Sequence, residues 1–230
     1  MVAQLEVPRL QAQAKKYTMP RMTNATTAEF WNKKYEAEKD IWGERPVSII
    51  AECEAAFREA GAKSVLVMAA GYGRNAKYFA DKGYSVEAVE ISEEAIRIGR
   101  KFAPEVRFIK GDALSVDPGK QYDAVFCFDI MQILLANERK ALAESCARLC
   151  RSAGIVMLSC LSTADALFGQ GRKVEERAFE GSYGLHFHYA DEDYMRGISG
   201  ALALERLGHF RETYDGGVTK DRIYGLYRKA

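Results

Sequence analysis

The sequence has no apolar run close to the roughly 18–20 residues that a membrane-spanning helix needs. Its first 22 residues have no apolar core of the kind a secretory signal requires, so we expect a cytoplasmic protein. The net charge of +1 provides neither a broadly basic nor a broadly acidic surface. We therefore expect no nucleic acid and no membrane among its partners.

Disulfide signals are also missing. The chain has five cysteines, an odd number, and no two of them have CxxC spacing. This usage is typical of reduced thiols in a cytosolic protein. The chain also has no internal repeat and no low-complexity tract.

A regular alternation of apolar strands and amphipathic helices begins near residue 61. With 230 residues, 48% of them hydrophobic, the chain can bury one full-sized α/β core. Such alternation implies a parallel sheet with right-handed crossovers. Strands are expected at 64–69, 85–90, 106–109, 122–128 and 154–160, and helices at 47–60, 73–82, from Ser92 onward, and at 137–150.

The rhythm breaks after Cys160. Residues 161–190 mix glycine, charge and aromatics without a steady period, which indicates an insert beside the active site. A short helix is expected at 191–199. Two last strands at 202–214 and 222–227 flank Asp215-Gly216-Gly217, a hairpin turn. We therefore predict an α/β, Rossmann-like, seven-stranded sheet, mostly parallel with a terminal antiparallel hairpin, and helices on both faces.

The strongest functional signal is the stretch SVLVMAAGYGRN at Ser64–Asn75, followed by SVEAVE at Ser85–Glu90. Gly71 and Gly73 leave the backbone bare where a buried strand turns into a helix, so a ligand can approach the N–H groups there. Glu90 ends the next strand, where nucleotide-binding α/β folds hold a ribose diol. This order indicates a nucleoside cofactor.

The residues VLVMAAGYGRNAKYFADKGYSVEAVEISEEAI, GDAL and YDAVFCFDIMQIL resemble a class I S-adenosylmethionine (SAM) dependent methyltransferase. Within that superfamily the chain is most similar to the thiopurine and tellurite-resistance methyltransferases. The resemblance covers about residues 27–228, including the insert and the closing hairpin. Val67 stands where many members carry an acid, and Ala69 replaces the first motif glycine.

The resemblance implies SAM as cofactor and assigns roles to individual residues. Glu90 would accept both ribose hydroxyls and Ile91 would pack on adenine. Asp112 and Ala113 would meet the adenine amino group and ring, and Phe128 would lie beside the sulfonium. The full implied cofactor set is Ala70, Gly71, Tyr72, Gly73, Arg74, Asn75, Glu90, Ile91, Asp112, Ala113 and Phe128.

Structural alternatives stand beside several of these roles. Asp112 could be only a turn residue after Gly111. Glu90 could be a solvated strand end, Phe128 a core residue, and Arg74-Asn75 only the start of a helix.

Methyl transfer is an in-line displacement that needs an aligned nucleophile, and it needs a general base only when the acceptor is protonated. The candidates for this role are His186, His188, Asp129 and Tyr189. His186 and His188 would share one face of a strand, which could also suit a metal, but no third ligand accompanies them. We therefore expect no metal, and a purely structural histidine pair is an equal alternative.

A helix preceding the regular alternation carries Phe30, Trp31, Lys34 and Tyr35 on one face, with Thr27 as its expected N-cap. These aromatics could pack on the domain or cover a cofactor. The expected division is an N-terminal arm at 1–26, which could include a short helix near 9–16, and one methyltransferase domain at 27–230 with the insert at 161–190.

The leading hypothesis is a methyltransferase that moves the SAM methyl group to the S, N or O atom of a small molecule. A second hypothesis, motivated by Val67 and Ala69, is a SAM-binding sensor or partner subunit without transfer activity. A third is a nicotinamide-dependent oxidoreductase, against which the hairpin and Asp112 count.

Overall fold

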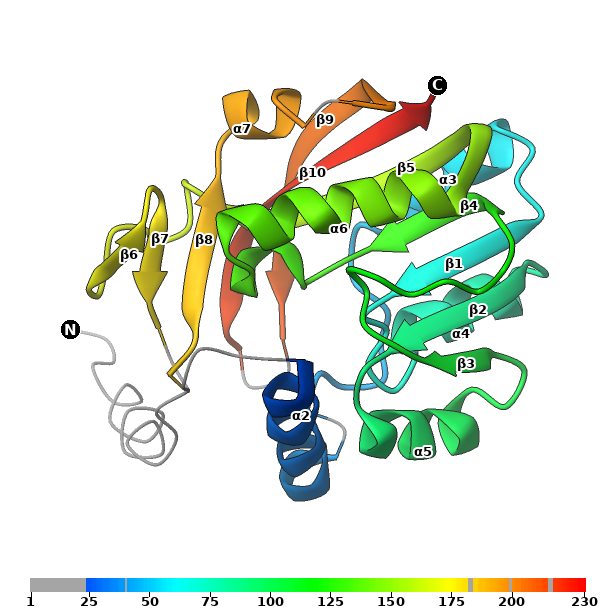
Figure 1. Cartoon of the computed structure of the whole chain (residues 1–230), viewed down its shortest axis with the longest axis horizontal. Helices are drawn as coiled ribbons and strands as arrows, with labels where there is room; N and C mark the ends of the chain where they lie inside the picture. Colours follow the sequence, from blue (N-terminus) through cyan, green and yellow to red (C-terminus); the bar gives the residue numbers. More distant parts are fainter. Residues whose placement is uncertain (1–23, 40, 182–183, 199, 215–216) are drawn as a thin grey trace.

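The computed structural model describes residues 24–39, 41–181, 184–198, 200–214 and 217–230. Within these residues the chain forms one twisted sheet with helices packed on both faces (Figure 1). The expected helix near 9–16 and the tip of the last hairpin at Asp215-Gly216 lie outside the described residues.

The first half of the sheet is parallel. Its strands lie side by side in the order β3-β2-β1-β4-β5. The strand β2 has the predicted bounds, and the other strands differ from prediction by one to four residues at their ends. The bounds are β1 Ser64–Met68, β2 Ser85–Glu90, β3 Arg107–Lys110, β4 Tyr122–Cys127 and β5 Cys150–Ser162.

An antiparallel hairpin completes the sheet. Strand β10 (Thr219–Lys229) pairs antiparallel with β5 on one side and with β9 (Leu202–Thr213) on the other. The described strands of the main sheet therefore run β3-β2-β1-β4-β5-β10-β9, and the predicted mostly parallel sheet with a terminal hairpin is confirmed.

The insert contains more regular structure than its sequence indicates. Strands β6 (Lys173–Glu175), β7 (Ala178–Glu180) and β8 (His186–Ala190) form a small antiparallel group, beside the main sheet in Figure 1. Strand β8 then pairs parallel with the end of β5, at Leu161 and Ser162. Strands of three to five residues are too short to produce a readable period of two.

The helices begin and end close to the predicted positions. The side chain of Ser92 accepts a hydrogen bond from Ala95 N, which confirms the predicted N-cap. The prediction that Thr27 caps the first helix was wrong, because that helix starts at Asn24 and Thr27 lies inside it. The bounds are α2 Asn24–Glu38, α3 Ile50–Glu59, α4 Arg74–Asp81, α5 Glu93–Phe102, η1 Met131–Ile133, α6 Ala136–Leu149 and α7 Glu192–Arg196.

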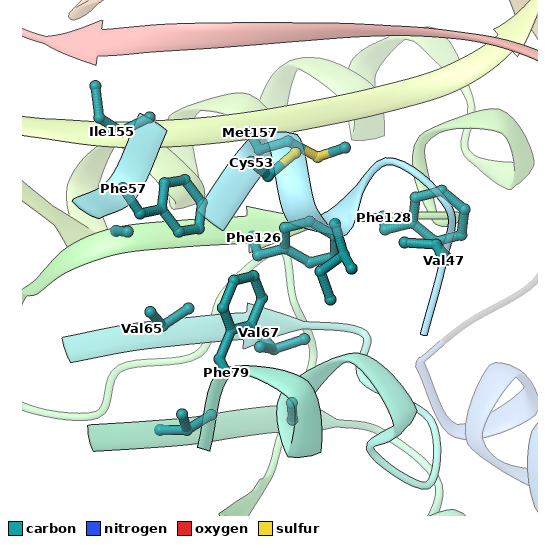
Figure 2. Close-up of a cluster of buried hydrophobic side chains, with 14 of the residues drawn as sticks. Val47, Cys53, Phe57, Val65, Val67, Phe79, Phe126, Phe128, Ile155 and Met157 are labelled. Carbon is teal, nitrogen blue, oxygen red and sulfur yellow. The ribbon is translucent and has the colours of Figure 1, made fainter. Parts of the chain in front are cut away.

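Two hydrophobic layers lie on opposite faces of the sheet. On one face, Phe57 of α3 and Phe79 of α4 stack at a centroid distance of 5.6 Å, and Phe79 contacts Phe126 of β4 (Figure 2). On the other face α6 covers the sheet through Leu142 and Cys146, in front of the strands in Figure 1. A central strand buried on both faces explains the uninterrupted apolar run in β4.

Val67 belongs to the first of these layers. It is 2% exposed and points into the same cluster as Phe79 and Phe126 (Figure 2). An acid at this place would bury an unpaired charge, so the valine is consistent with the packing here. None of the described helices has the length and apolarity to cross a bilayer.

Candidate functional site

A cleft lies at the carboxyl ends of β1, β2 and β4, which is where open α/β sheets bind ligands. Ten of the eleven residues predicted to bind the cofactor line it. These are Ala70, Gly71, Tyr72, Arg74, Asn75, Glu90, Ile91, Asp112, Ala113 and Phe128.

The turn between β1 and α4 requires left-handed backbone at alternate positions. Gly71 and Gly73 have φ of 58° and 90°, and Ala69 adopts φ of 49° without being glycine. A Cβ on Gly71 would lie 2.8 Å from the Tyr35 hydroxyl, and one on Gly73 would lie 2.8 Å from the Phe108 ring. Gly71 therefore faces the cleft, whereas Gly73, which does not line it, is fixed by packing.

Glu90 joins this turn to the end of β2. Its Oε2 accepts a hydrogen bond from Gly71 N at 2.7 Å, and its Oε1 accepts from Ile91 N and Ser92 N at 2.9 Å. The side chain is 5% exposed, and burial raises the pKa of its carboxyl while the three N–H donors oppose that rise. A carboxylate has about four acceptor sites, so one remains beyond these three bonds.

Tyr72, Arg74 and Asn75 hold the segment before α3 against the glycine turn. The Tyr72 hydroxyl donates to Gly43 O at 2.6 Å, and Arg74 Nη1 donates to the carbonyls of Trp42 and Arg45 at 3.1 and 3.0 Å. Asn75 Oδ1 accepts from Val47 N at 3.0 Å. These side chains border the cleft, and their hydrogen bonds to the backbone shape it.

The opposite wall follows β3. Asp112 Oδ1 accepts from Leu114 N at 3.0 Å, and the Asp112 carbonyl accepts from Ser115 N and Val116 N. Asp112 is thus a turn residue and a cleft residue at once, because it also lines the cavity together with Ala113.

At the end of β4, Asp129 is held by three side chains. Its carboxylate forms an ion pair with Arg222 Nη2 at 2.7 Å and accepts from the Tyr214 hydroxyl at 3.2 Å and from Gln132 Nε2. Its φ of 65° is uncommon for a residue other than glycine. The Arg222 guanidinium also lies 4.9 Å from the ring centre of Phe128.

Among the four candidates for a general base, Asp129 lines the described cleft, and His186, His188 and Tyr189 do not. They lie on β8, where His188 is 2% exposed and its ring lies 4.7 Å from that of Tyr194. Burial, with Arg139 and Arg177 nearby, lowers the pKa of His188 to about 3. The ring is therefore neutral at pH 7. Tyr189 packs against Phe168 and Phe179, and burial raises its pKa to about 12.

No described group of three or more His, Cys, Asp or Glu is arranged to hold a metal ion. The described cysteines are all buried free thiols.

The helix α2 lies over the cleft. Thr27, Trp31 and Tyr35 all line it, and Trp42 Nε1 donates to the Tyr35 hydroxyl at 3.3 Å. Asn32 anchors the helix, because its Oδ1 accepts from Ser92 Oγ at 2.7 Å and from Glu94 N at 3.2 Å. The aromatic face therefore both packs on the domain and covers the cleft.

Several lining residues escaped the sequence analysis. The cleft is also bordered by Trp42, Ile133, Leu134 and Glu138, and no motif in the sequence pointed to Trp42 as a lining residue. The run IMQIL after β4 was a usable signal, since it follows directly on Asp129.

The cleft suits an adenosyl cofactor. It combines a buried carboxylate with one acceptor site to spare, a glycine turn free of side chains, and an apolar wall formed by Phe128 and Ile91. The carboxylate can accept hydrogen bonds from a ribose diol, and the bare turn lets the cofactor come close to the main chain. The apolar wall can pack on an adenine ring.

Comparison with known proteins supports the same cofactor. Residues 65–154 match the methyltransferase domain family. A ubiquinone biosynthesis O-methyltransferase of Nitrosomonas europaea is 27% identical over 106 residues, a match that spans 44% of this chain and 44% of that protein. The chain thus aligns with less than half of this relative's length.

Solved structures share the fold over nearly the whole chain. Magnesium protoporphyrin IX methyltransferase of Synechocystis, solved with bound S-adenosylhomocysteine (SAH), has a TM-score of 0.68 at 18% identity, covering 90% of this chain and 99% of that one. A TehB-like SAM-dependent methyltransferase of Corynebacterium glutamicum has a TM-score of 0.53 at 18% identity, covering 90% and 98%.

Residues 65–154 thus match a methyltransferase domain, and the described chain has the fold of solved SAM-dependent methyltransferases. Among the solved structures with this fold, the TehB-like protein is one neighbour among several.

Proposed function

We propose that the whole protein transfers the SAM methyl group to the S, N or O atom of a small molecule, in the manner of the thiopurine and tellurite-resistance group. The observation that carries this proposal is the contact between Glu90 and Gly71, which ties the acid at the end of β2 to the glycine turn inside one cleft. The small-molecule acceptor agrees with the relatives named above, which act on small molecules by their names.

The cofactor roles follow the geometry of the cleft. Glu90 would accept from the ribose, Asp112 and Ala113 would border the adenine, and Ile91 would pack on it. Gly71 and Ala70 would face the methionine part, with Tyr72, Gly73, Arg74 and Asn75 fixing the turn. Bound SAM supplies a methyl carbon that is already activated by the sulfonium, so the chain mainly orients the acceptor and excludes water.

Asp129 is the candidate that best fits contact with the acceptor. It lies beside Phe128 at the end of β4, and its carboxylate is fixed by Arg222, Tyr214 and Gln132. A fixed carboxylate at this place can orient an N–H, O–H or S–H donor and accept its proton. For Phe128, the guanidinium of Arg222 already lies against the ring, and the sulfonium would approach from the cleft.

A SAM-binding protein without transfer activity is the second candidate. It is favoured by the strained turn, because Ala69 holds a left-handed conformation that glycine adopts at no steric cost. The nicotinamide alternative has less support, because β9 and β10 close the sheet in an antiparallel pair and residues 65–154 match methyltransferase domains.

Calorimetry with SAH tests the cofactor site. Replacing Glu90 with Gln removes a charged acceptor, and we expect SAH to bind about tenfold or more weakly. Glu87→Gln is the matched control. Glu87 lies on the same strand, but it accepts from the Tyr122 hydroxyl and does not line the cleft. Equal affinity of the Glu90 variant and the native chain would refute the assignment.

Turnover of labelled SAM with thiol, amine, phenol and metalloid acceptors tests the activity itself. A labelled product from at least one acceptor class is expected. Tight SAH binding without any product would favour the sensor.

A further inference from the structure

A second hollow adjoins the cleft. It has a volume of about 290 Å³ and is bordered by the segment before α3, the start of α4 and the end of β9. Trp42 and Arg74 line both this hollow and the cleft. A molecule that reaches past these two side chains can therefore occupy both spaces.

The second hollow has an excess of positive charge. Arg45, Arg74 and Arg211 line it, against one acid, Glu212. Glu212 is 5% exposed, and its carboxylate accepts from Ser48 N at 2.8 Å and from Ser48 Oγ at 2.7 Å. Ser48 thus occupies two acceptor sites of Glu212 without neutralising its charge, and the three guanidinium groups still outnumber this one carboxylate.

The arginines are held in place in different ways. Arg74 is 8% exposed and bonded to two backbone carbonyls, so its guanidinium is fixed. Arg211 is exposed and donates from Nε to Asp221 at 2.8 Å. A guanidinium has five N–H donors, so this bond leaves further donors on Arg211 for an anion.

The aromatic wall of the hollow is connected to the proposed acceptor site. Tyr214 lines the hollow, its ring lies 5.8 Å from that of Trp42, and its hydroxyl donates to Asp129 in the cleft. Arg222 Nη2 donates to the same hydroxyl at 2.5 Å. The wall between the two spaces is therefore rigid and aromatic.

We propose that this hollow binds an anionic group of the methyl acceptor, a carboxylate or a phosphate. The acceptor would place its ring or apolar body along Trp42 and its nucleophile next to Asp129. Arginine suits this role because its planar donors match both anions in bidentate geometry. This inference rests on the proposed methyl transfer, whose acceptor it restricts to molecules with a negative charge.

The test uses the full chain saturated with SAH and measures binding by calorimetry. Three pairs of probes differ only in charge: the para-carboxylate and para-carboxamide of thiophenol, aniline and phenol. Phenyl phosphate against phenol distinguishes phosphate from carboxylate. We expect at least one anion to bind roughly tenfold tighter than its neutral partner, with a preference that weakens as salt is added.

Arg45→Gln and Arg211→Gln should each reduce that preference severalfold and leave SAH affinity unchanged. Arg206→Gln is the matched control, because Arg206 lies on the same strand β9 but faces Glu52 at 3.5 Å. Equal binding of charged and neutral probes, failure of every anion to bind, or an equal loss in the Arg206 variant would each overturn the inference. Failure of SAH itself to bind would count against the proposed function instead.

Discussion

Ala69 has a φ of 49° directly before the glycine turn. The left-handed region costs a residue with a Cβ about 1–2 kcal/mol, whereas glycine adopts it freely. Glycine also loses more backbone entropy on folding, about 0.4–1 kcal/mol relative to alanine. We expect Ala69→Gly to leave the free energy of unfolding unchanged or to raise it by up to about 1 kcal/mol, measured by urea denaturation.

The neighbouring alanine provides the control for this substitution. Ala70 also lines the cleft, and its φ is not positive. Ala70→Gly relieves no strain and should destabilise the protein by at least about 0.4–1 kcal/mol, because it loses backbone entropy and the packing of the Ala70 methyl group on the core. A loss of similar size in both variants would show that the turn stores no strain at Ala69.

His188 makes stability depend on pH. Its folded pKa of about 3 lies below the usual value near 6.5 because burial disfavours the charged ring. The stabilisation is complete above about pH 6.5 and falls as the pH drops towards 3, since only the unfolded chain then binds the proton. The slope is about 1.4 kcal/mol per pH unit.

His188→Phe should remove this part of the pH dependence. Between pH 6.5 and pH 5 the native chain should lose about 2 kcal/mol more than the variant, measured by urea denaturation at both pH values. Loss of hydrogen bonds complicates the comparison little, because among the described residues only the backbone of Glu176 acts on the ring, and neither nitrogen has a well-formed partner. An unchanged slope in the His188 variant would contradict the prediction.

At the scale of the elements, the side chain of one asparagine on α2 forms hydrogen bonds to the start of α5. Asn32 accepts from Ser92 Oγ and Glu94 N, and the helix carries Trp31 and Tyr35 onto the cleft. We expect Asn32→Ala to weaken SAH binding severalfold and to accelerate amide exchange across α2. The expected loss of global stability is only about 1 kcal/mol, because one polar anchor is removed.

The exposed Glu36 of the same helix gives the control. Glu36→Ala keeps good helix propensity and should change neither SAH affinity nor amide exchange. Native affinity and native exchange in the Asn32 variant would mean that α2 is held by its aromatic contacts alone.

Long elements with strong patterns could be predicted, and short ones could not. The bounds of β2 and the cap at Ser92 follow from local chemistry, an apolar run ending in Glu90 and a serine before two acids. The strands β6 to β8 depend on pairing with one another and with the end of β5, which no local pattern records. The position of the cleft followed from the glycine turn at Gly71 and the acid Glu90 at the end of the next strand, and its other predicted residues followed from the family resemblance. Trp42 and Arg222 reach it only through tertiary contacts, as the bonds to Tyr35 and Asp129 show.

At the scale of the whole molecule, the last strand is tied to the cleft by a buried ion pair. Arg222 of β10 is 3% exposed and pairs with Asp129 after β4, although Arg222 lies 93 positions further along the chain. The Asp129 side chain is 22% exposed and keeps Gln132 and Tyr214 as partners. The two charges are therefore not equivalent when the partner is lost.

Removing the carboxylate should cost more than removing the guanidinium. Asp129→Asn leaves Arg222 as an unpaired buried charge and should lower the free energy of unfolding by about 3–5 kcal/mol. Arg222→Met leaves a carboxylate that still has two donors and contact with water, and the expected loss is about 1–3 kcal/mol. The double variant should lose about as much free energy of unfolding as Arg222→Met alone. In that variant the new amide at position 129 no longer faces an unpaired guanidinium. Urea denaturation of the four proteins measures this cycle, and losses that simply add would show that Asp129 and Arg222 contribute no coupling energy to stability.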